Sequence, residues 1–163
     1  MKIGILSDTH GAVGRTVRAM DTLIGRGSEA ILHCGDIGGE EAWSEIMALC
    51  RAYDLPLHAV LGNVDEYEPV IWSGPDGRLI TIRAELTLAG KSLAILHGHH
   101  FAALEQAISG GEYDYVFTGH THQARDERVG RTRVINPGAV YRASPCTVAM
   151  LDLAADALEF ITL

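Results

Sequence analysis

Short runs of strand type recur along the chain, and the first of them is continuously apolar, which predicts a strand covered on both faces. They lie at about residues 2–7, 29–34, 57–61, 79–83, 85–89, 113–117, 123–129, 132–135, 147–153 and 157–162, and one more run leaves the Gly90-Lys91 turn and ends at His97. Elsewhere apolar residues recur every three or four positions, which predicts helices with one apolar face. These helical patterns begin near Val13 and near Glu40, and a shorter one covers residues 100–109.

The order of these elements indicates the fold class. The first 65 residues follow the order β-α-β-α-β, which is typical of a parallel sheet with right-handed crossovers in an α/β protein. Residues 66–78 carry two prolines and two glycines and predict a surface loop. Trp72, within that loop, either anchors an interface or packs back on the core.

Composition limits the functions that are possible. A chain of 163 residues with 47% hydrophobic and 21% charged residues predicts a single domain over residues 1–163. The net charge of −8 argues against binding of long nucleic acid, and no apolar stretch approaches the roughly 18 residues of a membrane helix. The first predicted strand begins at about residue 2, which leaves no room for a signal peptide. The three cysteines are an odd number, and their spacing shows no paired pattern typical of disulfides. Reduced thiols and a cytoplasmic location are therefore expected, whereas a homo-oligomer stays open.

Five of the predicted strands end in side chains that can bind a metal. These candidates are Asp8, His10, Asp36, Asn63, His97, His120 and His122. In open α/β sheets, ligands bind outside the carboxyl ends of the strands, so all seven should converge on one edge. Seven ligands are too many for one tetrahedral zinc ion and suit two ions that share a carboxylate. Oxygen and imidazole donors without thiolate favour Mn²⁺, Fe, Zn²⁺, Ni²⁺ or Co²⁺ over Ca²⁺.

A structural explanation competes with the metal hypothesis for single residues. Asp8 could cap the helix that begins near Val13, and Asp36 could cap the one near Glu40. Capping does not explain the histidines, because histidine is a poor cap. The occurrence of metal-binding side chains at five strand ends therefore favours a metal site.

The motifs Asp8-Thr9-His10, Gly35-Asp36, Gly62-Asn63-x-Asp65, His97-Gly98-His99 and Gly119-His120-Thr121-His122 resemble, in this order, those of the calcineurin-like metallophosphoesterases. The resemblance covers residue 1 to about 153, and the short length together with Asn136-Pro137-Gly138-Ala139 resembles the small YfcE-type phosphodiesterases. It implies a four-layer α/β/β/α sandwich of two mixed sheets flanked by helices. It also implies one metal on Asp8, His10, Asp36 and His122, and another on Asp36, Asn63, His97 and His120, with Asp36 bridging.

The resemblance implies a hydrolase that cleaves a small phosphodiester with two divalent metal ions, Mn²⁺ foremost. Such ions would generate a bridging hydroxide that attacks phosphorus. Three further residues are candidates for roles around the metal ions. Asp65 would orient a ligand or the loop, and Arg142 would bind the phosphate as a clamp. His99 either contacts the substrate or a metal-bound water, or has a purely structural role. Val64 stands where many members have a histidine that acts as general acid, which disfavours monoesters with poor leaving groups.

Two other functions stay open from the sequence. The same family includes a retromer sorting subunit that serves mainly as a scaffold, and loss of ligands would have favoured that alternative. The second is a metal-dependent nuclease. The acidic net charge disfavours long nucleic acid but leaves small diesters possible.

Overall fold

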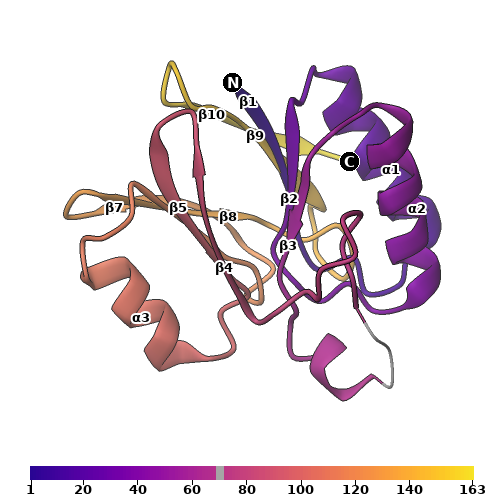
Figure 1. Ribbon diagram of the computed structural model, residues 1–163, viewed down its shortest axis with the longest axis horizontal. Coiled ribbons are helices and arrows are strands. Elements are labelled where there is room, and N and C mark those ends of the chain that lie inside the picture. The colour runs from indigo at the N-terminus through magenta and orange to yellow at the C-terminus, as the bar shows by residue number, and fades with distance from the viewer. Residues whose placement is uncertain (69–71) are drawn as a thin grey trace.

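The computed structural model of the protein describes residues 1–68 and 72–163 (Figure 1). Within them, ten strands form two five-stranded sheets. The first has the order β10-β9-β1-β2-β3, with β1 at Lys2–Leu6, β2 at Ala30–His33, β3 at Leu57–Ala59, β9 at Thr147–Asp152 and β10 at Ala157–Thr162. The second has the order β4-β5-β6-β8-β7, with β4 at Arg83–Leu88, β5 at Lys91–Leu96, β6 at Tyr115–Phe117, β7 at Ala124–Val129 and β8 at Thr132–Pro137. The helices are α1 at Val13–Gly25, α2 at Glu40–Ala52 and α3 at Phe101–Ser109, and a 3₁₀ turn, η1, spans Asp65–Tyr67.

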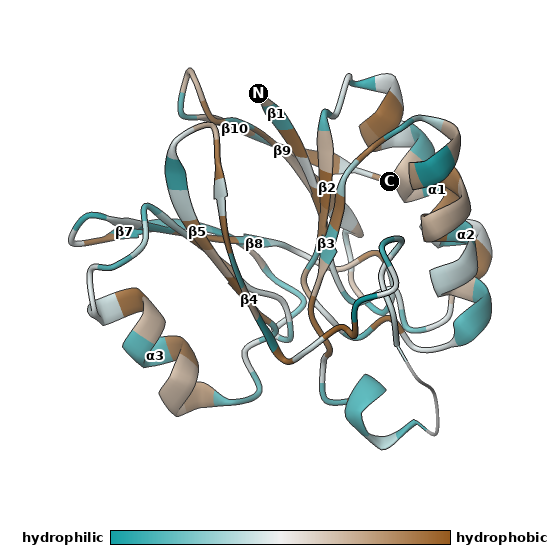
Figure 2. Ribbon diagram, viewed as in Figure 1, coloured by the Kyte–Doolittle hydropathy of each residue, from teal (hydrophilic) through white to brown (hydrophobic). Residues whose placement is uncertain are grey.

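The two sheets face each other, and helices cover their outer sides (Figure 1). Met20 and Leu23 of α1 pack in the core on the outer side of the first sheet. Ile5 and Phe117 belong to the cluster between the sheets, and Leu104 of α3 packs on the second sheet. Burying one such side chain stabilises the fold by about 1.5–3 kcal/mol. Figure 2 shows the resulting distribution, with apolar residues concentrated on the strands. The expected α/β/β/α sandwich is confirmed.

Parallel strands at the centre of each sheet determine where the loops gather. β1 pairs in parallel with β2, and β2 with β3. In the second sheet, β5 pairs in parallel with β6, and β6 with β8. The antiparallel strands β9, β10, β4 and β7 complete the sheets on their outer flanks. The carboxyl ends of each parallel set therefore lie at one edge, as expected of such sheets.

The starts of the first two helices decide between capping and another role for the aspartates. α1 has Ala12 at its N-cap and α2 has Gly39, and neither helix start receives a hydrogen bond from a capping side chain. Asp8 and Asp36 therefore cap neither helix, and the structural explanation for these two carboxylates is wrong.

The middle of the chain differs from the expectation. The predicted strand at 79–83 is wrong, because only isolated bridges occur at Leu79 and Thr81, and β4 is one strand that starts at Arg83. The apolar pattern misleads here because Leu79 and Ile82 are exposed at the surface. In the described residues no helix is both long and apolar enough to cross a membrane.

The predicted loop at 66–78 is described only in part, because residues 69–71 lie outside the described residues. The turn η1 occupies its start. Trp72 is 4% exposed and meets the ring of Trp43 edge-on. Its indole N–H donates to the backbone oxygen of Asp65 at 3.3 Å. Trp72 thus packs on the core, and its ring is not available as an interface anchor.

Candidate metal centre

The seven predicted ligands come from the loops that follow β1, β2, β3, β5 and β6, on both sheets. Asp8, Asp36 and His97 are buried, His10 and His122 are half-buried, and His120 is exposed at the rim. Because both sheets direct these strand ends to the same region, residues more than 110 positions apart in the chain meet there.

One group consists of Asp8, His10 and His122. Nε2 of His122 lies 3.1 Å from Oδ1 of Asp8 and 3.3 Å from Nε2 of His10. Nε2 of His10 lies 3.9 Å from the same Asp8 oxygen. Each residue thus offers one ligand atom within 4.8 Å of the other two, a spacing at which one ion can contact all three.

A second group consists of Asp8, Asp36 and His97 and shares Asp8 with the first. Nε2 of His97 lies 3.3 Å from Oδ2 of Asp36 and 3.9 Å from Oδ1 of Asp8. The same Asp36 oxygen lies 3.8 Å from Nε2 of His10. The carboxylate of Asp36 therefore stands between a histidine of each group. Nδ1 of His120 and Oδ1 of Asn63 meet at 3.1 Å, and the ring of His120 lies 5.2 Å from that of His97.

The tautomers of two histidines leave lone pairs directed at the carboxylates. A backbone carbonyl can only accept, so Nδ1–H of His97 donates to the carbonyl of Cys34 at 2.7 Å and Nδ1–H of His122 donates to that of Arg142 at 3.2 Å. A neutral imidazole then presents Nε2 as an acceptor. Among the described residues, Oδ1 of Asp8 and Nε2 of His97 are buried without a hydrogen-bond partner. Acceptors that face one another without a donor fit a cation, and this arrangement resembles that of metal-binding histidines.

The backbone around these residues is held in sparsely populated conformations. Asp8, His10, Asp36, His120 and His122 all have positive φ, between 45° and 68°. Such conformations are uncommon outside glycine and cost about 1–3 kcal/mol each. They persist only where the surrounding structure enforces them, and they concentrate at functional sites. Five strained residues among seven candidates are therefore independent support for a functional centre.

Charge and burial shift the pKa values of the clustered groups. Burial raises the pKa of the Asp8 carboxyl. Burial also opposes ionisation of Asp36, but contacts with His97 outweigh it and hold the pKa of Asp36 at about 2. Burial would lower the pKa of His97, whereas Asp36 and Asp8 raise it. A proton and a metal ion thus compete for Nε2 of His97.

Asp65 lies beneath this centre rather than in it. Its carboxylate accepts hydrogen bonds from the backbone N–H groups of Ile37 at 3.1 Å, Gly38 at 2.9 Å and Gly62 at 2.8 Å. Both oxygens are therefore occupied, and the side chain ties the loop after β2 to the loop after β3. Asp65 positions the segments that carry Asp36 and Asn63, and its oxygens are not free to contact a substrate.

His99 and Arg142 flank the centre on different sides. Nε2 of His99 contacts Oε1 of Glu66, and its ring lies 5.5 Å from that of His97. The Arg142 side chain is exposed, and its guanidinium carbon lies 5.7 Å from the centre of the Tyr141 ring. Its backbone oxygen meets His122, so Arg142 joins the rim of the centre.

Two positioning residues were not among the candidates. His33 is fully buried, accepts at Nδ1 from the Gly35 N–H and therefore donates from Nε2 to the Thr9 hydroxyl at 3.1 Å. Asn136 donates to the carbonyl of Gly119 at 2.7 Å and so holds the loop of the histidine pair. The available signal was that His33 lies two residues before the Gly35-Asp36 motif and that Asn136 opens the Asn136-Pro137-Gly138-Ala139 motif, but their polar partners depend on loop geometry.

Comparisons with known proteins find similar chains over nearly the whole length. The family model of the calcineurin-like phosphoesterase superfamily domain matches residues 1–156. Phosphodiesterase MJ0936 of Methanocaldococcus jannaschii is 32% identical over 158 residues, which cover 93% of each chain. Phosphodiesterase YfcE of Escherichia coli strain K12 is 27% identical over 165 residues, covering 93% of this chain and 88% of YfcE. The solved structure of a protein described as a novel archaeal phosphodiesterase superposes with a TM-score of 0.85 at 30% identity and covers all of both chains.

Proposed function

Because this chain belongs to the calcineurin-like phosphoesterase superfamily, we propose that its candidate metal centre hydrolyses a small phosphodiester. The chain is a phosphoesterase by its family and by its identity to the relatives above. A diester substrate is supported because MJ0936 and YfcE are both named phosphodiesterases. A small substrate is supported by the net charge of −8, which repels long nucleic acid.

We assign the seven ligands to two divalent ions. One ion takes Asp8, His10, Asp36 and His122, and the other takes Asp36, Asn63, His97 and His120. The contacts of Asp36 support its bridging role, because its Oδ2 reaches His10 of the first set and His97 of the second. Mn²⁺ is the proposed metal, and Ni²⁺, Fe, Zn²⁺ and Co²⁺ suit the same donors.

Divalent ions bound there would activate water near neutral pH and would offset negative charge on the phosphate oxygens. The chain contributes the anionic carboxylates that balance the ions, and the carbonyls of Cys34 and Arg142 orient His97 and His122. The guanidinium of Arg142, at the rim, is proposed to bind a phosphate oxygen. Val64 follows Asn63 and carries no titratable group, so this position cannot protonate a leaving oxygen.

The buried, unpartnered pair of Oδ1 of Asp8 and Nε2 of His97 carries this proposal. Leaving a buried polar group without a partner costs about 1–3 kcal/mol, and the two proposed ions, one on Asp8 and the other on His97, would each remove one such cost. A non-catalytic scaffold would not need the complete set of ligands.

The test is hydrolysis of bis(p-nitrophenyl) phosphate by protein loaded with Mn²⁺. We expect turnover that a chelator abolishes and added Mn²⁺ restores. Asp8→Asn should remove it, whereas Asp21→Asn, on the exposed face of α1, should leave it unchanged. Turnover that persists after complete removal of metal, or equal turnover in the two variants, would refute the proposal.

A further inference from the structure

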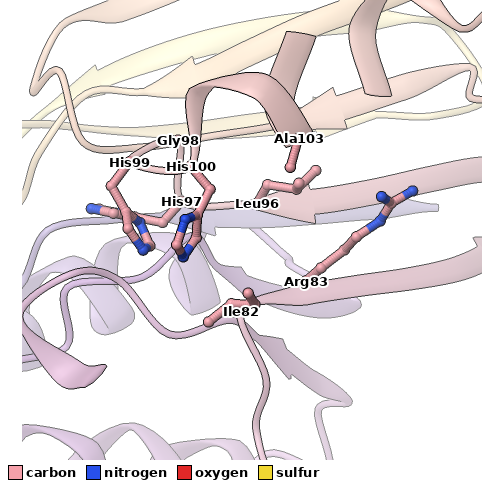
Figure 3. A pocket seen from close by; sticks show the side chains of 8 residues that line it. All are labelled: Ile82, Arg83, Leu96, His97, Gly98, His99, His100 and Ala103. Atoms are coloured by element: carbon pink, nitrogen blue, oxygen red, sulfur yellow. The ribbon is translucent and has the colours of Figure 1, made fainter. Parts of the chain in front are cut away.

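A second cluster of metal-binding side chains lies beside the seven ligands and shares no residue with them. It consists of Glu66, His99 and His100. Oε1 of Glu66 contacts Nε2 of His99 and lies 3.4 Å from Nε2 of His100. The centres of the two rings are 4.1 Å apart, and Figure 3 shows the imidazoles side by side. The two nitrogens and the carboxylate oxygen all lie within 4.8 Å of one another.

Two separately anchored segments bring these side chains together. Glu66 lies in η1, directly after Asp65, whose carboxylate is held by three backbone amides. His99 and His100 follow Gly98, whose φ of 116° few other residues adopt, and His100 is the N-cap of α3. The cluster is thus fixed on both sides.

We propose that Glu66, His99 and His100 bind a third divalent cation of borderline softness, such as Zn²⁺. Two imidazoles and one carboxylate are a common ligand set for this class of ion. Three protein ligands leave a position for water or an anionic ligand, as in open zinc sites. The side chains of His99, Glu66 and His100 are 13%, 30% and 51% exposed, so an ion can reach them from solvent.

A simple hydrogen bond between His99 and Glu66 is the competing explanation. That hydrogen bond accounts for the contact between His99 and Glu66. It does not explain why Nε2 of His100 also lies close to the same oxygen of Glu66. A shared oxygen and two adjacent nitrogens are what a common ion requires. The competing explanation predicts that His100 contributes nothing to metal binding, and this difference can be measured.

The third ion would lie at the border of the first centre. The ring of His99 lies 5.5 Å from that of His97 and 6.3 Å from that of His120. A cation there would add positive charge beside the proposed phosphoester site and favour substrates with a further anionic group. This consequence rests on the proposed function, whereas the ion site itself does not.

The experiment counts bound Zn²⁺ per chain by equilibrium dialysis with saturating Zn²⁺ and locates the ions by anomalous diffraction. We expect three ions in the wild type and two in Glu66→Gln and in His100→Gln. The matched controls Glu105→Gln, exposed on α3, and His58→Gln, on β3, should keep three. The exposed position of His100 makes its substitution compatible with folding.

The absence of an ion on Glu66, His99 and His100 in the wild type, or an ion retained there in both cluster variants, would overturn the third site. The result also separates this inference from the proposed function. Hydrolysis by a protein with no ion on these three residues refutes the third site and leaves the function intact. An ion on Glu66, His99 and His100 in a protein without hydrolysis refutes the function alone.

Discussion

Gly62→Ala places a methyl group inside the proposed metal centre. An added Cβ would lie 2.1 Å from Oδ1 and 2.3 Å from the backbone nitrogen of Asp36. Ordinary contact begins at 3.4 Å, so the carboxylate must move from 2.1 to 3.4 Å, a shift of about 1.3 Å. Because Asp36 is the proposed bridge, this displacement disturbs both ions together.

The size of the effect follows from that displacement. Misplacing a catalytic group by about 1 Å can cost about 10²-fold in rate, so turnover of the activated diester should fall by at least that factor. Overpacking of a tight contact costs about 1–3 kcal/mol of stability. In a chain of this length, Tm should fall by about 2–4 °C for each kcal/mol lost.

The assay combines bound Mn²⁺ per chain, turnover of bis(p-nitrophenyl) phosphate and Tm. Gly25→Ala is the matched control, because its added Cβ meets nothing within 4 Å at the end of α1. The control should keep metal, activity and stability. Full metal content and wild-type turnover in Gly62→Ala would show that Asp36 does not bridge the ions in the described position.

Asp36→Ala should lose both ions, whereas His122→Ala should mainly weaken one, and metal analysis of the two variants checks this difference. Val64→His should selectively raise turnover of an alkyl monoester relative to bis(p-nitrophenyl) phosphate, because a positioned acid contributes about 10² to 10⁴ in rate for a poor leaving group; an unchanged ratio would show that protonation is not limiting. Burial lowers the pKa of His33 from 6.5 to about 3 in the folded chain. Between pH 6.5 and about pH 3, His33 is therefore protonated in the unfolded chain but neutral in the folded chain. The free energy of unfolding consequently falls as the pH falls through this range. The stability difference between wild type and His33→Gln should therefore narrow from pH 7 to pH 4 in urea titrations, and a constant difference would contradict it.

Much of the fold was predictable because apolar periodicity and burial coincide in the central strands. In the runs that became β1, β2 and β5, all residues are buried except Lys2, Lys91 and Ser92 at the strand starts, so their apolar character matches their burial. The run near residues 79–83 was misleading because Leu79 and Ile82 lie at the surface, where an apolar side chain carries no information about pairing.

The candidate site was predictable only as far as strand ends determine it. Carboxyl ends of parallel strands meet at an edge, so the seven ligands could be grouped without coordinates. The contact between Glu66 and His99 joins residues 33 positions apart through two irregular segments, and no periodic pattern encodes it. The same holds for Asn136, whose hydrogen bond to Gly119 depends on a strained loop.

Anomalous diffraction at the manganese edge, from crystals of the Mn²⁺-loaded protein, would locate the two proposed ions directly. We expect two peaks about 3.5–4 Å apart, the usual spacing of two-metal sites, with the carboxylate of Asp36 between them. His10 and His122 should lie on one peak, and His97 and His120 on the other. A single peak at this edge of the sheets, or two peaks that do not share Asp36, would contradict this expectation.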